Sequence, residues 1–256
     1  MAVERNRRMK ACCFCMLIWV LALTGLSYAG RPLNIDDPFP VELHKFQIET
    51  GAGYAGVDSN NHFDVPLTLT YGVLPNIETQ VGLGGQFDSR KDDDDETEYE
   101  QGLSDMTLSF KWNFLRHDQA FFDHGLSGTI KLPTASRRRG LGTGKVDYDL
   151  TYIIQKDLND RASILFNLGY TWTGDREEGD VIRYGLAIIY QWTDRLAPVA
   201  ELVFETPIEG ELTSMGSNVG IRYAINDTLT LDAAIGKKVA GDWPDWTSTV
   251  GLTWVF

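Results

Sequence analysis

From His44 to the end of the chain, hydrophobic residues alternate with small or polar ones, so the pattern repeats every two residues rather than every 3.6. Around residue 108, for example, Met106, Leu108 and Phe110 alternate with Thr107 and Ser109. Successive side chains of a strand point to opposite faces, so each strand has one apolar face and one small or polar face. The alternation predicts twelve strands, at 44–55, 63–73, 77–87, 102–114, 125–132, 146–156, 161–173, 181–192, 196–205, 214–224, 228–238 and 246–256.

The links between the predicted strands alternate in length. Most of the short links have three or four residues, and they lie at 74–76, 157–160, 193–195 and 225–227; the link at 115–124 is the exception to the short class. The links between them have seven residues or more, at 56–62, 88–101, 133–145, 174–180, 206–213 and 239–245. Outer-membrane barrels show this alternation, with tight periplasmic turns and longer outer loops.

Aromatic residues on the apolar face gather at the ends of the predicted strands. The predicted outer ends carry Tyr54, Phe63, Phe87, Tyr148, Trp172, Phe204 and Trp246, and the predicted periplasmic ends carry Tyr71, Trp112, Phe114, Tyr190, Trp192, Tyr223, Trp254 and Phe256. A soluble β-sandwich has the same alternation but places its aromatics in mid-strand, whereas amphipathic rings favour the headgroup layer of a membrane. The pattern therefore predicts an all-β fold: a transmembrane, antiparallel, up-and-down β-barrel of about twelve strands over residues 44–256.

The first 29 residues have the layout of a secretory signal peptide. A basic start precedes an apolar run from Ala11 to Leu26, and Ser27 and Ala29 are small residues at the positions that a signal peptidase reads. The alternative is an N-terminal membrane anchor, but the run is shorter than the roughly 20 residues that a spanning helix needs. We expect export, cleavage before Gly30, and location in a Gram-negative outer membrane.

Residues 30–43 form a Pro-rich lead-in without periodicity. We expect this segment on the periplasmic side of the barrel, and its placement inside the lumen is the alternative.

Charge and cysteine content exclude several functions. The net charge of the chain is -13, and because residues 1–29 hold four bases and one acid, residues 30–256 carry -16. So acidic a chain is unsuited to nucleic acid, whose phosphates need a basic surface. All three cysteines lie within residues 1–29, so the processed chain has no disulfide and no thiolate metal site.

The histidines predict no catalytic or metal centre. The four of them stand at strand edges or in links, without spacing for a shared metal and without a Ser–His or Asp–His pair on one wall; they are His44, His62, His117 and His124. We therefore expect no catalytic residue, no cofactor and no metal. A barrel enzyme that acts on lipids is the least favoured alternative.

Ionisable residues fall mainly on the face opposite the apolar one. The inward acids are Glu49, Asp64, Glu78, Asp105, Asp147, Asp149, Glu201, Glu205 and Asp232, and the inward bases are Lys111, Lys131, Arg183, Arg222 and Lys238. Facing lipid, a base at the midplane would cost roughly 2–4 kcal/mol, so this face is expected to line a pore. Glu49, Glu201 and Asp232 fall near mid-strand in the first, ninth and eleventh predicted strands, which share one sector of the closed wall with the tenth and twelfth between them. A pore ringed by carboxylates favours cations. The alternative is a network of these acids with Arg222 and the lysines that only fills the barrel.

Two charged clusters lie in predicted outer loops. Asp92–Asp95, Glu96, Glu98 and Glu100 form an acidic loop, and Arg137–Arg139 stand in the next outer loop. The simplest interpretation of the acidic loop is a solvated loop, and divalent-cation binding beside lipopolysaccharide is the alternative. A contact between the two clusters that folds one loop over the mouth is a further hypothesis.

The last strand ends in a pattern that resembles the C-terminal signal read by the barrel-assembly machinery. A polar residue precedes Gly251, and aromatics stand third from last and last, at Trp254 and Phe256. We therefore expect the assembly machinery to be a partner of this chain, together with outer-membrane lipids, lipopolysaccharide and a small-molecule solute.

Several stretches resemble the family of outer-membrane proteins named for the MetA pathway of phenol degradation. They are Arg31-Pro32-Leu33, Asp36-Asp37-Pro38, Asp64-Val65-Pro66-Leu67, Tyr71-Gly72-Val73-Leu74-Pro75-Asn76, Gly102-Leu103-Ser104-Asp105-Met106, Lys111-Trp112, Lys131-Leu132-Pro133-Thr134, Gly140-Leu141-Gly142-Thr143-Gly144 and Asp147-Tyr148. The resemblance implies a barrel channel for uptake of small, often aromatic compounds. Passive diffusion of a small solute is the leading function, and a structural or adhesive barrel with a plugged lumen is its first rival.

Overall fold

The computed structural model describes residues 30–57, 60–91, 97–118, 120–175, 179–208 and 212–256. These residues form thirteen strands and one short 3₁₀ helix. The elements are β1 (Phe46–Val57), β2 (Asn60–Leu74), β3 (Ile77–Lys91), β4 (Thr97–Leu103), β5 (Met106–Leu115), β6 (Asp123–Leu132), η1 (Arg137–Arg139), β7 (Asp147–Asn159), β8 (Ala162–Trp172), β9 (Val181–Tyr190), β10 (Leu196–Pro207), β11 (Ser214–Ala224), β12 (Leu229–Ala240) and β13 (Trp246–Val255). No helix among the described residues has both the length and the apolar character needed to cross a membrane.

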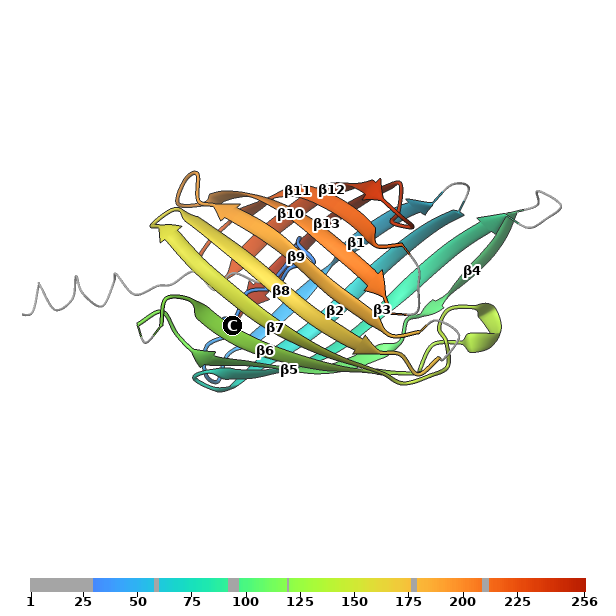
Figure 1. Ribbon diagram of the computed structural model, residues 1–256, viewed down its shortest axis with the longest axis horizontal. Coiled ribbons are helices and arrows are strands. Elements are labelled where there is room, and N and C mark those ends of the chain that lie inside the picture. Colours follow the sequence, from blue (N-terminus) through green and yellow to red (C-terminus); the bar gives the residue numbers. More distant parts are fainter. Residues whose placement is uncertain (1–29, 58–59, 92–96, 119, 176–178, 209–211) are drawn as a thin grey trace, which may run out of the picture.

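The strands form one closed antiparallel barrel (Figure 1). Strands that are neighbours in sequence pair in space except β4 and β5, which both pair with β3. Because β1 pairs with both β2 and β13, no edge of the wall is left open there. Closure satisfies the backbone of every wall strand without a partner protein, which is the condition for crossing lipid with strands. The predicted all-β barrel of about twelve strands is confirmed: twelve strands make the wall, and β4 is extra.

The extra strand β4 lies mostly in the predicted loop 88–101 and ends at a break in a predicted strand. Residues 102–114 were expected to be continuous, but Ser104 and Asp105 interrupt them and separate β4 from β5. Both strands pair with β3, β4 along 85–91 and β5 along 77–82. The long β3–β4 hairpin projects beyond the rim at the end opposite the C-terminus (Figure 1).

This hairpin corrects the expectation of an acidic loop at 88–101. Residues 88–91 and 97–101 are paired strand, including Glu98 and Glu100, while 92–96 lie outside the described residues. Beyond the rim both faces of a hairpin can meet water, so its pairing needs no apolar face. The predicted loop at 56–62 is likewise mostly strand, because Val57 pairs with Asn60.

The outer surface of the barrel is apolar. Large exposed side chains alternate along each strand, as in Leu67 and Leu69 of β2, and many are aromatic. Ring pairs stand near both strand ends, including Tyr54–Trp246 at one end and Trp254–Phe256 at the other. An apolar band with aromatic rings at both margins fits a barrel embedded in lipid.

The inner surface is less polar than the sequence suggested. A buried apolar cluster lies on the inner face of β8, β9 and β10, where small or polar residues were expected; it contains Ile35, Leu165, Ala187, Ile189, Ala197, Val199 and Val203. Only Ile35 comes from outside the wall. The inward apolar residues of these three strands are buried because Ile35, which precedes β1, packs against them inside the barrel.

The barrel closes at its two terminal strands. Phe46 and Phe256 exchange two backbone hydrogen bonds of 2.9 Å each, and their rings stack with centroids 5.8 Å apart. Trp254 and Phe256 lie on the outer face, as the alternation predicted. Gly251 faces the lumen instead, where it has a separate role described below.

Candidate pore and the segment inside it

Residues 30–43 lie inside the barrel. Ile35 and Pro38 are buried, and the backbone of the segment bonds to side chains of β3, β10 and β11. The expected periplasmic position is therefore wrong, and the alternative placement in the lumen is the one observed. A Pro-rich segment suits this place, because proline has no N–H group that would need a partner in the lumen.

Glu201 of β10 is the strongest anchor of the segment. Its carboxylate is 4% exposed and accepts hydrogen bonds from the backbone N–H groups of Asn34 and Ile35, at 2.9–3.0 Å. The side-chain amides of Asn34 and Asn218 donate to it as well, at 2.8 and 2.6 Å. Hydrogen bonds to an ionised acceptor are about twice as strong as neutral ones, so Glu201 compensates its own burial by holding the segment.

A second anchor joins β3 and β5 to the segment. Glu78 accepts a hydrogen bond from the Val41 backbone at 2.6 Å. Lys111 lies 3.5 Å from Glu78 and 2.9 Å from Asp36, and both Glu78 and Lys111 are buried. Charges buried this deeply are tolerated only when paired, so the segment's Asp36 completes the local balance.

Arg31 forms the third anchor. Its guanidinium lies 3.3 Å from Asp232 of β12 and donates to Thr249 at 2.8 Å. Arg222 donates in turn to the Arg31 carbonyl at 2.6 Å. A Cβ added at Gly251 would come within 2.3 Å of the guanidinium, so the Arg31 side chain would have to move if residue 251 carried a side chain.

Three cavities surround the segment. The Trp243 cavity, about 370 Å³, and the Arg31 cavity, about 280 Å³, lie toward the outer ends of the strands and share Asn34 and Trp243. The Lys111 cavity, about 270 Å³, is lined by Glu49, Glu78 and Lys111 near the periplasmic ends. Asn34 lines all three cavities. The contact between Asn34 and Glu201 therefore lies between the two outer cavities and the Lys111 cavity.

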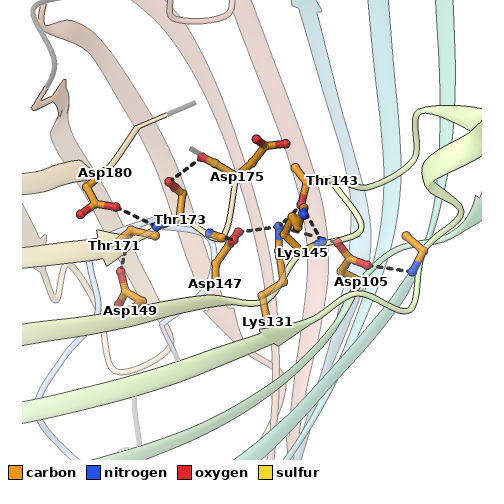
Figure 2. Close-up of polar contacts among 12 residues, drawn as sticks. Asp105, Lys131, Thr143, Lys145, Asp147, Asp149, Thr171, Thr173, Asp175 and Asp180 are labelled. Carbon is orange, nitrogen blue, oxygen red and sulfur yellow. Dashed lines mark hydrogen bonds and ion pairs between the residues drawn. The ribbon is translucent and has the colours of Figure 1, made fainter. Parts of the chain in front are cut away.

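A row of acids and bases follows the inner wall at the outer mouth (Figure 2). Lys131 of β6 makes ion pairs with Asp105 and Asp147. Asp105 accepts from the Ala135 backbone at 2.7 Å, and Asp147 accepts from the Gly174 backbone at 2.9 Å. The row therefore ties the loops after β6 and β8 to the wall.

The row continues on β7 to β9. Asp149 accepts hydrogen bonds from Thr151 and Thr171, each at 2.8 Å, and pairs with Arg183 at 2.9 Å. Asp180 accepts from the Thr173 backbone at 3.0 Å and so fixes the end of the loop after β8 (Figure 2). These acids are engaged by wall and loop donors rather than free in the mouth.

The predicted pore residues are therefore divided among these contacts. Those bonded to the segment are Glu78, Lys111, Glu201, Arg222 and Asp232, and those in the outer row are Asp105, Lys131, Asp149 and Arg183. Glu49 contacts Thr253 at 3.4 Å and lines the Lys111 cavity. The expected trio of Glu49, Glu201 and Asp232 thus does not form one free group, because the segment occupies two of its members.

The loop after β6 folds against the β3–β4 hairpin. Arg139 donates to the Gln101 carbonyl and Arg90 donates to the Gly140 carbonyl, at 3.2 and 3.1 Å. Leu141 is buried and its carbonyl accepts from Gln86. These hydrogen bonds involve no acid of the charged cluster, and Asp92–Glu96 lie outside the described residues, so a contact between the two charged clusters stays a hypothesis.

Two histidines have carboxylate partners that the sequence did not reveal. His62 lies 2.7 Å from Asp88, and His117 lies 3.1 Å from Asp123. The expectation that the chain has no Asp–His pair is therefore wrong. Within the described ranges, neither imidazole is hydrogen-bonded to a serine, and no group of three His, Cys, Asp or Glu side chains is placed to hold a metal ion.

Sequence reasoning missed Trp243 and Asn34. Trp243 stands in the connection after β12, which the sequence presents as an ordinary outer loop, yet its indole packs on the inner apolar cluster. Asn34 belongs to a segment without periodicity. The sequence offered one indication of the role of Trp243, namely a large hydrophobic residue in a predicted loop. The small inward residue that makes room for it, Gly216, is adjacent only in the folded barrel.

Comparison with known proteins adds a family and a set of similar folds. A family model described as "Putative MetA-pathway of phenol degradation" matches residues 29–256. The COG4313 outer membrane channel from Pseudomonas putida F1 is 13% identical, with a TM-score of 0.71 over 88% of this chain and 100% of that chain. The NanC porin is 8% identical, with a TM-score of 0.57 over 81% and 98% of the two chains. The CymD monoaromatic hydrocarbon channel is 9% identical, with a TM-score of 0.50 over 84% and 89%. A search of curated proteins finds no match.

Proposed function

Because the chain belongs to this family named for the MetA pathway of phenol degradation, we propose that it is an outer-membrane channel through which a small solute diffuses passively. The observation that carries the proposal is the closed barrel with an apolar exterior and a charged interior that holds three cavities. The solute passes beside residues 30–43 rather than through an empty lumen. The similar folds of porins and channels support this function and give no support to an enzyme.

Electrical and osmotic measurements test the channel function. Purified protein in a planar bilayer should give discrete conductance steps, and proteoliposomes should swell in small aromatic solutes faster than in disaccharides. A protein that conducts no ions and admits none of these solutes would contradict the proposal.

A plugged structural barrel is the second candidate, and the contacts of residues 30–43 favour it. Three anchors, at Glu201, Glu78 and Asp232, hold the segment across the lumen. If the wild type is silent in bilayers while a variant without the segment conducts, the plugged barrel is the correct function. Hydrolysis of phospholipid by the purified protein would instead support a barrel enzyme.

The proposal includes how the protein reaches its membrane. A signal peptide at 1–29 is cleaved, the assembly machinery reads Gly251, Trp254 and Phe256, and the finished barrel contacts outer-membrane lipids and lipopolysaccharide. N-terminal sequencing of protein from outer membranes should give Gly30 as the first residue, and a start at Met1 would contradict cleavage.

A further inference from the structure

The inward positions of β1 form a continuous series that leads from the Lys111 cavity to the Arg31 cavity. Residues 47 and 49 line the Lys111 cavity near the periplasmic end, and residues 53 and 55 line the Arg31 cavity near the outer end. Gly51 stands between the two pairs, and a Cβ placed there would lie 2.5 Å from the Arg31 guanidinium. Arg31 lines both cavities, so its side chain lies between them along this strand.

The Arg31 side chain crosses from the segment to the wall at this point. Its guanidinium donates to Asp232 of β12 at 3.3–3.4 Å and to the Thr249 hydroxyl of β13 at 2.8 Å. Gly251 of β13 pairs with Gly51 of β1, and both glycines face the guanidinium. At this wall the two cavities are thus separated by one long side chain that lies over two glycines.

The other side of the segment has no comparable series. Toward the periplasm from the Trp243 cavity, the inward residues of β10 are Glu201, Val199 and Ala197; they are 2–4% exposed and line none of the three cavities. Ile35 of the segment packs against this part of the wall. The Trp243 cavity is therefore followed by buried side chains, whereas the Arg31 cavity is followed by a side chain that is 18% exposed.

From this arrangement we propose that solutes cross the lumen along β1, between the Arg31 cavity and the Lys111 cavity, and that Arg31 sets the width and the charge preference of the passage. The inference rests on the proposed channel function and adds the route and the residue that controls it. To open the passage, the guanidinium leaves its wall partners, while the buried apolar cluster on the other side stays in place. Rotation of one side chain is faster than movement of a whole segment.

The charge of Arg31 gives the passage its selectivity. A guanidinium stays protonated throughout the physiological pH range. The side chain of its ion-pair partner, Asp232, is only 1% exposed, so the cation of the pair faces the passage and the anion does not. The narrow point therefore presents a positive group, although acids outnumber bases on the inward face as a whole. Such a group reduces the flow of cations relative to anions.

Blocking of single cysteines locates the route. Protein produced from residue 30 onward has no cysteine, so Ala55→Cys places one thiol in the Arg31 cavity and Gln80→Cys places one in the Lys111 cavity. Reaction with a trimethylammonium-ethyl methanethiosulfonate should lower the single-channel conductance about twofold or more at both positions, because the added group narrows the passage. The matched control is Thr129→Cys in the Trp243 cavity, where the reagent should leave the conductance unchanged.

Reagents of opposite charge at residue 31 test the selectivity. In Arg31→Cys, aminoethyl methanethiosulfonate restores a cation, whereas sulfonatoethyl methanethiosulfonate places an anion at the same position. Both modified proteins lack the native contacts of Arg31 with the wall, so they differ in charge and not in the loss of an anchor. The reversal potential in a salt gradient should shift toward cation preference with the anionic reagent and toward anion preference with the cationic one. The two reagents on Thr129→Cys should give equal reversal potentials.

The outcomes separate the route from the channel function. Block at Thr129→Cys equal to that at Ala55→Cys and Gln80→Cys would overturn the proposed route. Reversal potentials of modified Arg31→Cys that do not follow the charge of the reagent would overturn the role of Arg31. Both results leave a conducting channel in place. A protein that conducts under none of these conditions would instead remove the channel function, and the route with it.

Discussion

At the scale of single residues, buried carboxylates are the groups that define the lumen. Glu201 and Glu78 are nearly inaccessible, yet each accepts backbone N–H groups of residues 30–43. An unpaired charge at either position would carry a large desolvation penalty, which the segment removes. The wall and the segment therefore stabilise each other, because the buried carboxylates of the wall depend on the segment for their hydrogen-bond donors.

Glu201→Gln should loosen the segment. The amide keeps one acceptor oxygen but loses the charge that strengthens the bonds from Asn34 and Ile35. All three cysteines lie within residues 1–29, so Leu33→Cys in protein produced from residue 30 onward gives a single thiol. A membrane-impermeant maleimide should label it about tenfold faster in Glu201→Gln.

The matched control for this experiment is Glu205→Gln on the same strand. Glu205 lines the Trp243 cavity and has no recorded bond to residues 30–43, so labelling there should match the parent. Equally faster maleimide labelling in both variants would show that loss of either carboxylate on β10 has the same effect. Glu201 would then not be a specific anchor of the segment.

Gly251→Ala tests whether the ion pair of Arg31 with Asp232 depends on the room that Gly251 leaves on the lumen side of the wall. The added methyl would overlap the guanidinium and displace it from Asp232, so the unfolding midpoint in detergent should fall by several degrees. At Gly85 a Cβ would have its nearest contact at 3.8 Å, so Gly85→Ala should unfold like wild type. Identical midpoints for the two variants would argue against the Arg31 contact as a source of stability.

At the scale of elements, alternation predicted most of the barrel because each wall strand divides lipid from lumen. Within the regularly paired stretches, inward and outward positions follow from parity, so the inward placement of Lys111 and Glu201 could be predicted from the sequence. The break at Ser104 and Asp105 was not accessible, because it changes strand pairing without changing parity. The β3–β4 extension was missed for the related reason that strands beyond the rim need no apolar face.

The position of residues 30–43 lies outside what such patterns can predict. Its contacts join residues 37 to more than 200 positions apart, as between Val41 and Glu78 or Arg31 and Asp232. Such contacts depend on the closed barrel, and a proline-rich segment has no repeat that reports them. The inward apolar residues of β8–β10, such as Val199, were the one feature of the sequence that indicated a segment packed inside the lumen.

Removal of Phe256 should lower the amount of folded barrel in the outer membrane. The residue ends the last strand and exchanges both of its backbone hydrogen bonds with Phe46, so its loss weakens closure as well as the proposed assembly signal. Heat-modifiable, protease-resistant protein should decrease several-fold on gels. Phe256→Tyr keeps an aromatic and the backbone and should assemble normally; undiminished assembly of the deletion would refute both roles.

At the scale of the whole molecule, the segment controls how much of the lumen's charge is exposed. Replacing residues 31–42 with a Gly/Ser linker of equal length should raise single-channel conductance several-fold, because the linker has none of the three anchors. It should also increase cation preference, since Glu201 and Asp232 lose their partners while the wall keeps its excess of acids. Reversal potentials in a salt gradient measure this preference.

The charge contribution can be isolated in the same linker variant. Adding Glu49→Gln, Glu201→Gln and Asp232→Asn should reduce its cation preference without closing it. A linker variant with wild-type conductance would mean that the segment does not limit flow, and selectivity indifferent to the three substitutions would mean that ions pass elsewhere.

The attachment of residues 30–43 to late strands also constrains how the molecule is made. This segment precedes β1 and is therefore synthesised before every strand, yet its partners Glu201, Arg222 and Asp232 follow it by 167 to 201 residues. Its anchors at Glu78 and Lys111 need only β3 and β5, but the anchors at Glu201, Arg222 and Asp232 cannot form until β10 to β12 are in place. Full attachment of the earliest described part of the polypeptide therefore depends on strands made late, so we expect a chain truncated before β10 to leave this segment held at Glu78 and Lys111 alone.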